Sequence, residues 1–406
     1  MAHSQRLRHL EVNLDSSWNN NTGTLLDALP TSASKLQTLR IVNSSYSYEV
    51  LRMPEAAFQE VECLQLLDLR GVQPSWRSKL FGQNITSLTI HGSSNSNGRQ
   101  DEGLRPSALD FVGALRRLTR LAALSLQRTA PRNANPETVG VANLPTSLCT
   151  VELVDTPVNI ANALRLMAVP PTTPVSLQAQ HYSGPEDISV LFVCLGEYYS
   201  PSTWVLGGSS FFRAVEMACS GNCNSKLRAW VDEPGDFPVG VENPPALSLI
   251  VCMRNQSVRS HQEIAKQFFA ATFQYLPIQN VVKFHCGNVQ APIPQLVRAF
   301  GTLSQLRTMI IDDASGARSI VNLLKQKKGF LHGVPLPGLE CLSLRSIKIE
   351  NNDERSKQQS LSFESLLDCL TDRKTRKTTL SLLDTRGCTI SERMLNKLSR
   401  VVGKLN

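Results

Sequence analysis

The chain has 406 residues, of which 41% are hydrophobic, and its 42 Lys and Arg against 34 Asp and Glu give a formal net charge of +8. This hydrophobic fraction excludes a wholly disordered chain. The length exceeds what one compact core organises, so several domains or one long repeat array are expected. The positive charge is spread along the chain, and its densest cluster, Arg373-Lys374-Thr375-Arg376-Lys377, is expected to be a solvated helix end.

A motif of the form L-x-x-L-x-L recurs from one end of the chain to the other. Most spacings among the first six copies match the 20–29 residues typical of leucine-rich repeats, and the longer spacings indicate insertions. A degenerate copy stands at Leu380-x-Leu382. The other copies begin at Leu7, Leu36, Leu64, Ile85, Leu121, Leu148, Leu306 and Leu339.

The alternation within each copy predicts a short strand whose leucines point to one side, because successive side chains of a strand face opposite ways. The residues between copies must return to the next strand, often as a helix. The sequence therefore predicts an α/β leucine-rich-repeat solenoid, with a curved parallel sheet and outer helices. Its inner side is expected to bury one residue from each strand: Leu10, Leu39, Leu67, Leu88, Leu124, Val151, Met309 and Leu342.

Several return segments have helical periodicity. The segment 107–118 places Leu109, Val112, Leu115 and Leu118 on one face, with Ser107 as its cap. Three later segments have the same spacing of apolar residues and predict helices at 260–275, 362–370 and 391–402.

The repeat motif fades in the middle of the chain, which suggests three parts. N-terminal leucine-rich repeats occupy 1–156, and C-terminal repeats with a terminal helix occupy 246–406. Between them, 157–245 holds either degenerate, hairpin-decorated repeats or a short break in the array. Within it, 211–218 and 227–231 flank a turn and predict a β-hairpin.

Three late segments resemble the end of F-box/leucine-rich-repeat proteins of basidiomycete type: Leu339-Glu-Cys-Leu-Ser-Leu344, Phe363-Glu-Ser-Leu-Leu-Asp-Cys-Leu370 and Leu380–Ile390 with the helix after it. This resemblance implies that the repeats hold the substrate of an SCF-type ubiquitin ligase. An F-box would precede the repeats, yet the first repeat begins at Leu7 and Leu29-Pro30 leads into a strand motif. Binding of the Skp adaptor is therefore not expected.

No catalytic signature of a nucleotide-binding loop, a serine hydrolase or a zinc protease occurs in the sequence. Cys219 and Cys223 could bind zinc with His285 and Cys286, but their wide separation favours free thiols. His285 and Cys286 should point to opposite faces of a strand and so cannot pair, and His285, like His91, is expected on an exposed strand face. We expect a protein that is not an enzyme, with no metal and no cofactor.

The side chains between the strand leucines should project onto the concave face of the sheet. We take six of them as candidate partner-binding residues: Arg40, Asp68, Arg70, His91, Gln127 and Glu152. Their mixed charges favour a protein partner, because a face that binds nucleic acid would be more uniformly basic. A basic nucleic-acid-binding repeat protein is the alternative, and a hydrolase in the irregular middle is the third hypothesis.

The ten cysteines have irregular spacing and lie mostly in apolar runs, which indicates reduced thiols. No secretory signal and no apolar stretch long enough to span a membrane is apparent. These features predict a cytoplasmic or nuclear protein without a membrane partner.

Overall fold

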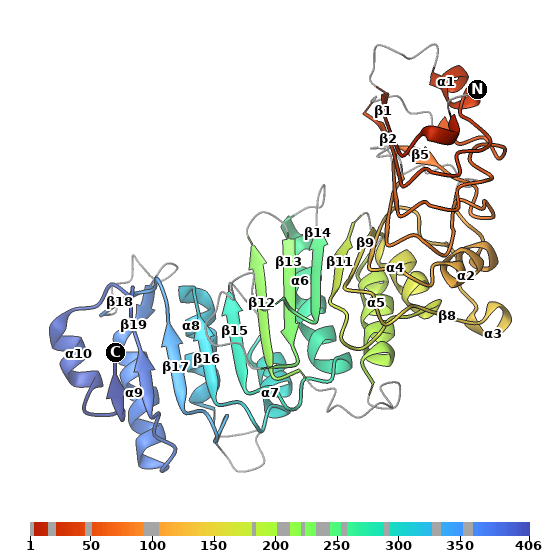
Figure 1. The fold of residues 1–406 in the computed structure, drawn as a ribbon. Helices are drawn as coiled ribbons and strands as arrows, with labels where there is room; N and C mark the ends of the chain where they lie inside the picture. The colour runs from red at the N-terminus through yellow and green to blue at the C-terminus, as the bar shows by residue number, and fades with distance from the viewer. Residues whose placement is uncertain are drawn as a thin grey trace. The chain divides into compact units, whose positions relative to one another are not determined.

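The computed structural model of the chain describes residues 4–14, 22–44, 51–92, 105–180, 184–200, 212–220, 224–232, 244–252, 258–287, 292–326, 334–351 and 360–406. The chain divides into two compact units, Met1–Cys194 and Leu195–Asn406. In each unit short strands lie side by side, and the chain returns from one strand to the next through helices and turns (Figure 1).

The first unit is built on a ladder of parallel strands that follows the order of the sequence. Each of these strands contains one of the predicted repeat motifs, apart from the last. In the described residues the ladder consists of β1 (His9–Leu14), β2 (Thr38–Asn43), β4 (Leu66–Arg70), β6 (Ser87–His91), β7 (Ala123–Gln127), β9 (Thr150–Asp155) and β11 (Val175–Ala179). Two shorter parallel pairs lie beside it, β3 (Leu51–Arg52) with β5 (Val72–Gln73) and β8 (Ala142–Asn143) with β10 (Met167–Ala168).

The register of this ladder places the predicted inner leucines opposite one another, so they form a continuous buried row. Leu39, Leu67, Leu88, Leu124 and Val151 are partners in adjacent strands and at most 1% exposed. Leu10 occupies the same row but is only half-buried, because β1 is the first strand and has a neighbour on one side only. The predicted inner row is thus confirmed, and its residue on the first strand is less buried than the others.

The return segments of the first unit form short helices. They are the 3₁₀ helix η1 (Ser4–Arg6), α1 (Thr22–Asp27), α2 (Ala108–Arg117), α3 (Pro136–Val139), α4 (Pro157–Arg165) and α5 (Pro185–Tyr198), which runs to the start of the second unit. Ser107 caps α2 as predicted, accepting a hydrogen bond from the Asp110 amide. The predicted face was wrong at Leu109, which is 63% exposed. The helix instead buries a face centred on Phe111 and Leu115, because Phe111 is its largest apolar side chain.

The second unit contains an antiparallel insertion in an otherwise parallel ladder. The predicted hairpin is confirmed: β12 (Ala214–Ser220) and β13 (Asn224–Trp230) are antiparallel, and β13 pairs in the same sense with β14 (Leu247–Cys252). Antiparallel neighbours can be joined by a tight turn, so β12, which ends at Ser220, and β13, which begins at Asn224, need no return helix between them. Parallel strands continue from β12 through β15 (Lys283–Gly287), β16 (Thr308–Ile311), β17 (Cys341–Leu344), β20 (Leu382–Asp384) and β21 (Lys404–Leu405).

The remaining elements of the second unit are one small strand pair and the return helices. The pair is β18 (Lys348–Glu350) with β19 (Ser360–Ser362). The helices are α6 (Val258–Tyr275), α7 (Ile293–Gly301), α8 (Ala314–Leu324), α9 (Phe363–Thr375) and α10 (Glu392–Leu398), so the three helices predicted in this unit are confirmed. The strands bury a second row of inner residues that includes Met309 and Leu342, both 0% exposed.

The expectation of a solvated helix end at 373–377 was wrong for one residue. The cluster does lie at the end of α9, but Arg373 is 0% exposed. Its guanidinium donates hydrogen bonds of 2.8 and 3.1 Å to the carbonyls of Pro335 and Leu336. The arginine therefore joins α9 to the turn that precedes β17, and the rest of the basic cluster stays at the surface.

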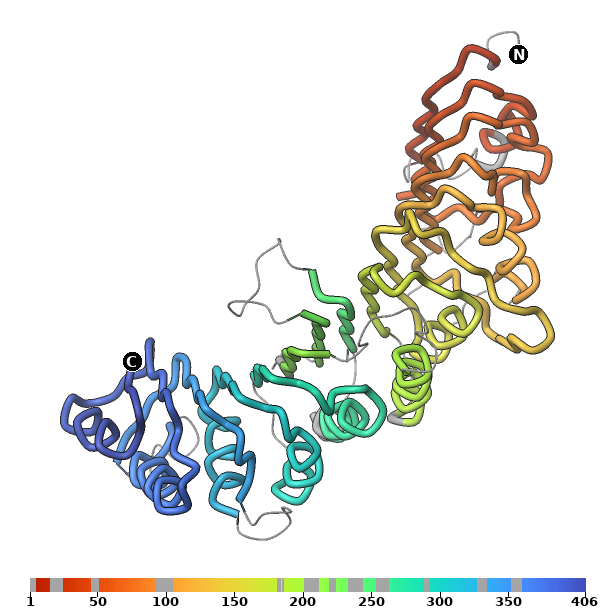
Figure 2. Tube along the Cα trace, turned by 60° about the horizontal axis from the view of Figure 1, so that its bottom comes forward, coloured from red at the N-terminus to blue at the C-terminus, as the bar shows by residue number. Residues whose placement is uncertain are grey.

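Each unit is thus a stack of strand-and-return repeats, as the tube of the chain shows (Figure 2). Its core combines aliphatic side chains with buried phenylalanines. The predicted α/β leucine-rich-repeat solenoid is confirmed, with β12–β14 as its antiparallel departure.

Candidate protein-binding face

The side of the first-unit sheet that lies opposite the buried leucines presents rows of aligned side chains, and two of these rows contain the candidate residues. We call this surface the open face. All six candidate partner-binding residues lie on it. The first row runs Glu11, Arg40, Asp68, Thr89, Ser125, Glu152, Ser176, and the second runs Asn13, Val42, Arg70, His91, Gln127, Val154, Gln178.

Asp68 is the centre of an ion-pair network at one end of the open face. Its carboxylate lies 2.9 Å from Nε of Arg70, which donates a hydrogen bond, and 3.2 Å from Nε of Arg40. The N–H of Arg40 is not directed at the carboxylate, so that contact is an ion pair only. Arg40 also faces Glu11 at 3.6 Å. The Asp68 side chain is 11% exposed while both arginines are more than 40% exposed, so the cations and not the carboxylate face the solvent.

His91, Ser125 and Glu152 form a second network on the three strands that follow. The Ser125 hydroxyl donates to Oε2 of Glu152 at 2.9 Å, and Nε2 of His91 lies 3.3 Å from the same hydroxyl. Since that hydroxyl proton is directed at Glu152, Nε2 of His91 must be the donor to Ser125. Burial, and next the Arg70 guanidinium, lower the pKa of His91, against opposing effects of Asp68 and Glu152. The imidazole is therefore neutral at pH 7, with Nδ1 as an acceptor.

The network of His91, Ser125 and Glu152 differs from a catalytic triad. A serine nucleophile needs a histidine that accepts its proton and an acid that orients the histidine. Here the serine donates to the acid, and the histidine donates to the serine. This hydrogen-bond pattern orders the three side chains and does not prepare Ser125 as a nucleophile. Gln127, half-buried, lies beside His91 in the second row.

A hexapeptide that analysis of the sequence overlooked occurs twice, once in each unit. It reads Leu-Leu-Asp-Leu-Arg-Gly at 66–71 and Leu-Leu-Asp-Thr-Arg-Gly at 382–387. In both copies the aspartate is buried and accepts a 2.9 Å hydrogen bond from Nε of the arginine two residues later. In both, the glycine that ends the strand has a positive φ, 68° at Gly71 and 78° at Gly387. The repeated D-x-R-G was the signal that could have identified this arrangement.

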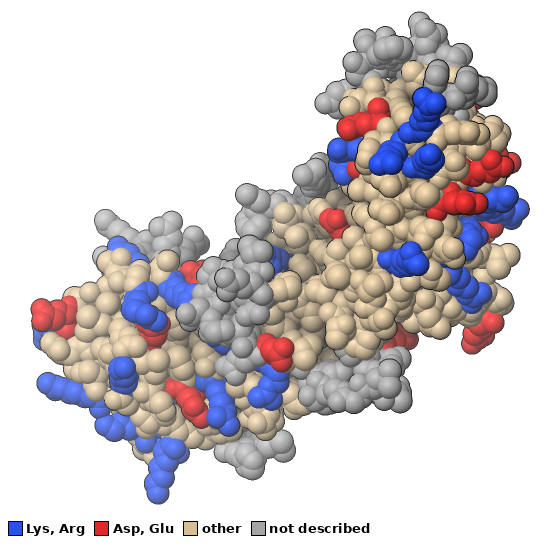
Figure 3. Space-filling view, viewed as in Figure 1, with Lys and Arg blue, Asp and Glu red and all other residues tan. Residues whose placement is uncertain are grey.

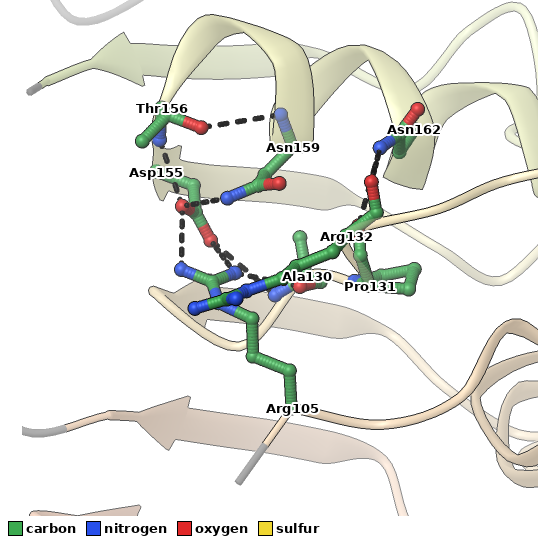
Figure 4. Close-up of polar contacts among 8 residues, drawn as sticks. All are labelled: Arg105, Ala130, Pro131, Arg132, Asp155, Thr156, Asn159 and Asn162. Carbon is green, nitrogen blue, oxygen red and sulfur yellow. Dashed lines mark hydrogen bonds and ion pairs between the residues drawn. The ribbon is translucent and has the colours of Figure 1, made fainter. Parts of the chain in front are cut away.

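A buried polar cluster fixes the chain at the carboxyl ends of β7 and β9 (Figure 4). Arg105 donates to both oxygens of Asp155, at 2.7 and 2.9 Å, and to the carbonyl of Ala130 at 2.6 Å. The same carboxylate accepts from the Thr156 amide and from the side chain of Asn159 at the start of α4. The two charged side chains are 5% and 2% exposed, so this cluster is structural and offers no surface to a partner.

The strand face of the second unit does not resemble the open face. The expectation that His285 is exposed was wrong: it is 6% exposed, and Lys283 and Glu216 are buried as well. β15 pairs with β12 and β16, and Glu216 of β12 is the register partner of His285. Nε2 of His285 lies 2.6 Å from Oδ2 of Asp312. His91, also expected to be exposed, is half-buried.

Of the four residues considered for zinc, the structure describes the side chains of His285 and Cys286. Cys286 belongs to the buried row and His285 to the opposite side of β15, as predicted for adjacent residues of a strand. Cys223 and the side chain of Cys219 lie outside the described residues. Among the residues that are described, no group of three or more metal-binding side chains occurs. None of the described helices has both the length and the apolar character needed to cross a membrane.

Comparison with known proteins adds no function. No protein-family model and no curated protein matches the chain. Among solved structures, an internalin of Listeria monocytogenes is similar over 84% of this chain and 80% of its own, with 14% sequence identity and a TM-score of 0.26. At this score the likeness carries no argument, so the assignment to leucine-rich-repeat solenoids rests on the motif and on the strand register described above.

Proposed function

We propose that this protein is a non-enzymatic recognition scaffold and that it binds a protein partner on the open face. The observation that supports this proposal is the register of the first unit. It brings Arg40, Asp68, Arg70, His91, Gln127 and Glu152 from five adjacent strands onto one solvent-facing surface. A solenoid uses such a surface to contact a partner with residues that are distant in sequence.

The charges of the open face favour a protein over nucleic acid. Glu11 and Glu152 lie in its first row on either side of Arg40 and Asp68, and both are exposed. A continuous run of phosphates along this row would meet both carboxylates. Lys, Arg, Asp and Glu are also interspersed over the visible surface of the first unit (Figure 3). This mixture suits a protein surface of mixed charge.

The finer role that we propose is the one implied by the sequence resemblance, that of the substrate-holding repeats of an SCF-type ubiquitin ligase. Its support is the set of late repeat segments, 339–344, 363–370 and 380–390, which form β17, α9 and β20. In such a receptor the open face would hold the substrate protein.

Site-specific photocrosslinking in cells tests the proposal. A photoreactive residue at Gln127 on the open face should crosslink to a discrete protein, whereas the same residue at the exposed Glu137 of α3 should not. The double change Arg40→Ala and Arg70→Ala should remove the crosslink. The matched control is Arg307→Ala with Arg386→Ala, two exposed and ion-paired arginines of the second unit. Crosslinks that are equal at Gln127 and Glu137, or that survive the first double change, would contradict the proposal.

A further inference from the structure

The two copies of the D-x-R-G motif hold their arginines differently. In the second unit, Arg386 uses two nitrogens on Asp384: Nε on Oδ1 and Nη2 on Oδ2, each at 2.9 Å. In the first unit, only Nε of Arg70 is bonded to Asp68, because Arg40 approaches the other carboxylate oxygen. The terminal nitrogens of Arg70 have no acceptor among the residues that the structure describes. The N–H groups on Nη1 and Nη2 of Arg70 can therefore donate to a partner.

Asp68 also fixes the position of these unused donors. The carboxylate is buried at the base of the network, so it holds Arg70 by Nε and leaves the other edge of the guanidinium on the open face. A side chain that is already held loses less conformational entropy when it binds. Arg40 adds a second cation on the neighbouring strand, and His91 is the direct register partner of Arg70 on the other side.

The chemistry of this position is specific for one kind of group. A guanidinium with two free parallel N–H donors matches the two oxygens of a carboxylate, which it binds in a bidentate way. We propose that Arg70, supported by Arg40, receives the carboxylate of an Asp or Glu side chain of the protein partner. This inference rests on the proposed function, since it names the chemistry that the partner must carry.

The surroundings favour a single carboxylate over a polyanion. Glu11 lies next to Arg40 at 3.6 Å, and Glu152 lies in the same row on the other side. Between them Thr89 and Ser125 present small neutral side chains, which leave room for an acidic residue flanked by neutral ones. The site thus fits an acidic residue within a peptide segment of low charge.

Peptide selection on the full chain tests this inference. Dodecamer peptides displayed on phage are selected for binding to the protein. Each selected peptide is then tested on the Thr89→Tyr variant, whose bulky neutral side chain covers the middle of the open face. Peptides that do not bind this variant are called blocked peptides. For each blocked peptide, dissociation constants are measured by fluorescence anisotropy with the peptide and with its Glu→Gln or Asp→Asn version. Arg70→Gln and Arg70→Lys are compared with Arg386→Gln, which alters the same motif in the second unit. Thermal melting confirms that each variant is folded.

We expect the blocked peptides to share an acidic residue whose neutralisation weakens binding about tenfold or more, as for a charged anchor in an interface. Arg70→Gln should cause the same loss, and the two changes together should not add, because they remove one contact. Arg70→Lys should lose part of the affinity since it lacks the fork, and Arg386→Gln should leave it within about twofold.

Two other outcomes are distinguishable. Peptides that Thr89→Tyr blocks, but that lack an acidic position or ignore both Arg70 variants, would overturn this inference and leave the proposed function standing. A selection in which Thr89→Tyr blocks no peptide would count against the open face as a binding surface, and so against both.

Discussion

Arg105 and Asp155, fifty residues apart, form a bidentate ion pair with side chains that are almost fully buried. Replacing Arg105 with Met should lower the free energy of unfolding by about 3–5 kcal/mol, because the carboxylate is then left buried without its counterion. Urea denaturation measures this loss. The control is Arg77→Met: Arg77 lies at the same 2.7 Å from Asp110 but is 78% exposed, so solvent screens this pair and its loss should lower the free energy of unfolding far less. Equal effects of the two changes would show that the buried pair is not a special source of stability.

The inner row of the first unit can be tested with two neighbouring leucines of β4. Leu67 is 0% exposed and Leu66, which points the other way, is 36% exposed. Leu67→Asp should unfold the first unit, since a buried unpaired charge costs more than about 3 kcal/mol. Leu66→Asp should melt within a few degrees of the unchanged protein. If Leu67→Asp keeps its melting temperature, the assigned register is incorrect.

Gly71 should not tolerate a side chain. Its φ of 68° is strained for other residues, and an added Cβ would lie 3.0 Å from the carbonyl oxygen of Asn43. Gly71→Ala should therefore destabilise the protein by about 1–3 kcal/mol. Gly82 has an ordinary φ, and a Cβ there would have only one contact, at 3.7 Å, so Gly82→Ala serves as the control. Chemical denaturation of both variants checks the difference, and an unchanged Gly71→Ala protein would disprove the strained turn.

The pKa of His91 should respond to Arg70. The guanidinium is the second cause, after burial, that lowers this pKa, so Arg70→Gln should raise it. The pKa of His91 in the folded protein lies below its value near 6.5 in the unfolded chain. At a pH between these two pKa values, the unfolded chain therefore binds more protons than the folded protein. The contribution of His91 to stability is thus present above pH 6.5 and falls as the pH drops through the folded pKa. Arg70→Gln should reduce this loss of stability at acidic pH. NMR titration of the imidazole Cε1–H signal measures both values, and an unshifted or lower pKa in the variant would refute the coupling.

The sequence by itself determined the strands and the side to which each of their residues points. Side chains alternate along a strand, so the spacing of Leu39, Leu67 and Leu88 was enough to place them in the core and Arg40, Asp68 and Arg70 on the opposite face. The hairpin of β12 and β13 was also local, because two apolar runs and a turn define it.

Only the tertiary structure decided how deeply each polar residue lies and what it contacts. His285 lies on the outer side of its strand, as the residues of the open face do, yet it is buried beside Glu216 and Asp312 from other segments of the chain. Arg373 is buried because carbonyls 37 and 38 residues earlier accept its hydrogen bonds. The sharing of Asp68 by Arg40 and Arg70 depends on the register between β2 and β4. A local pattern fixes the direction of a side chain, whereas burial and partners depend on which distant segments pack against it.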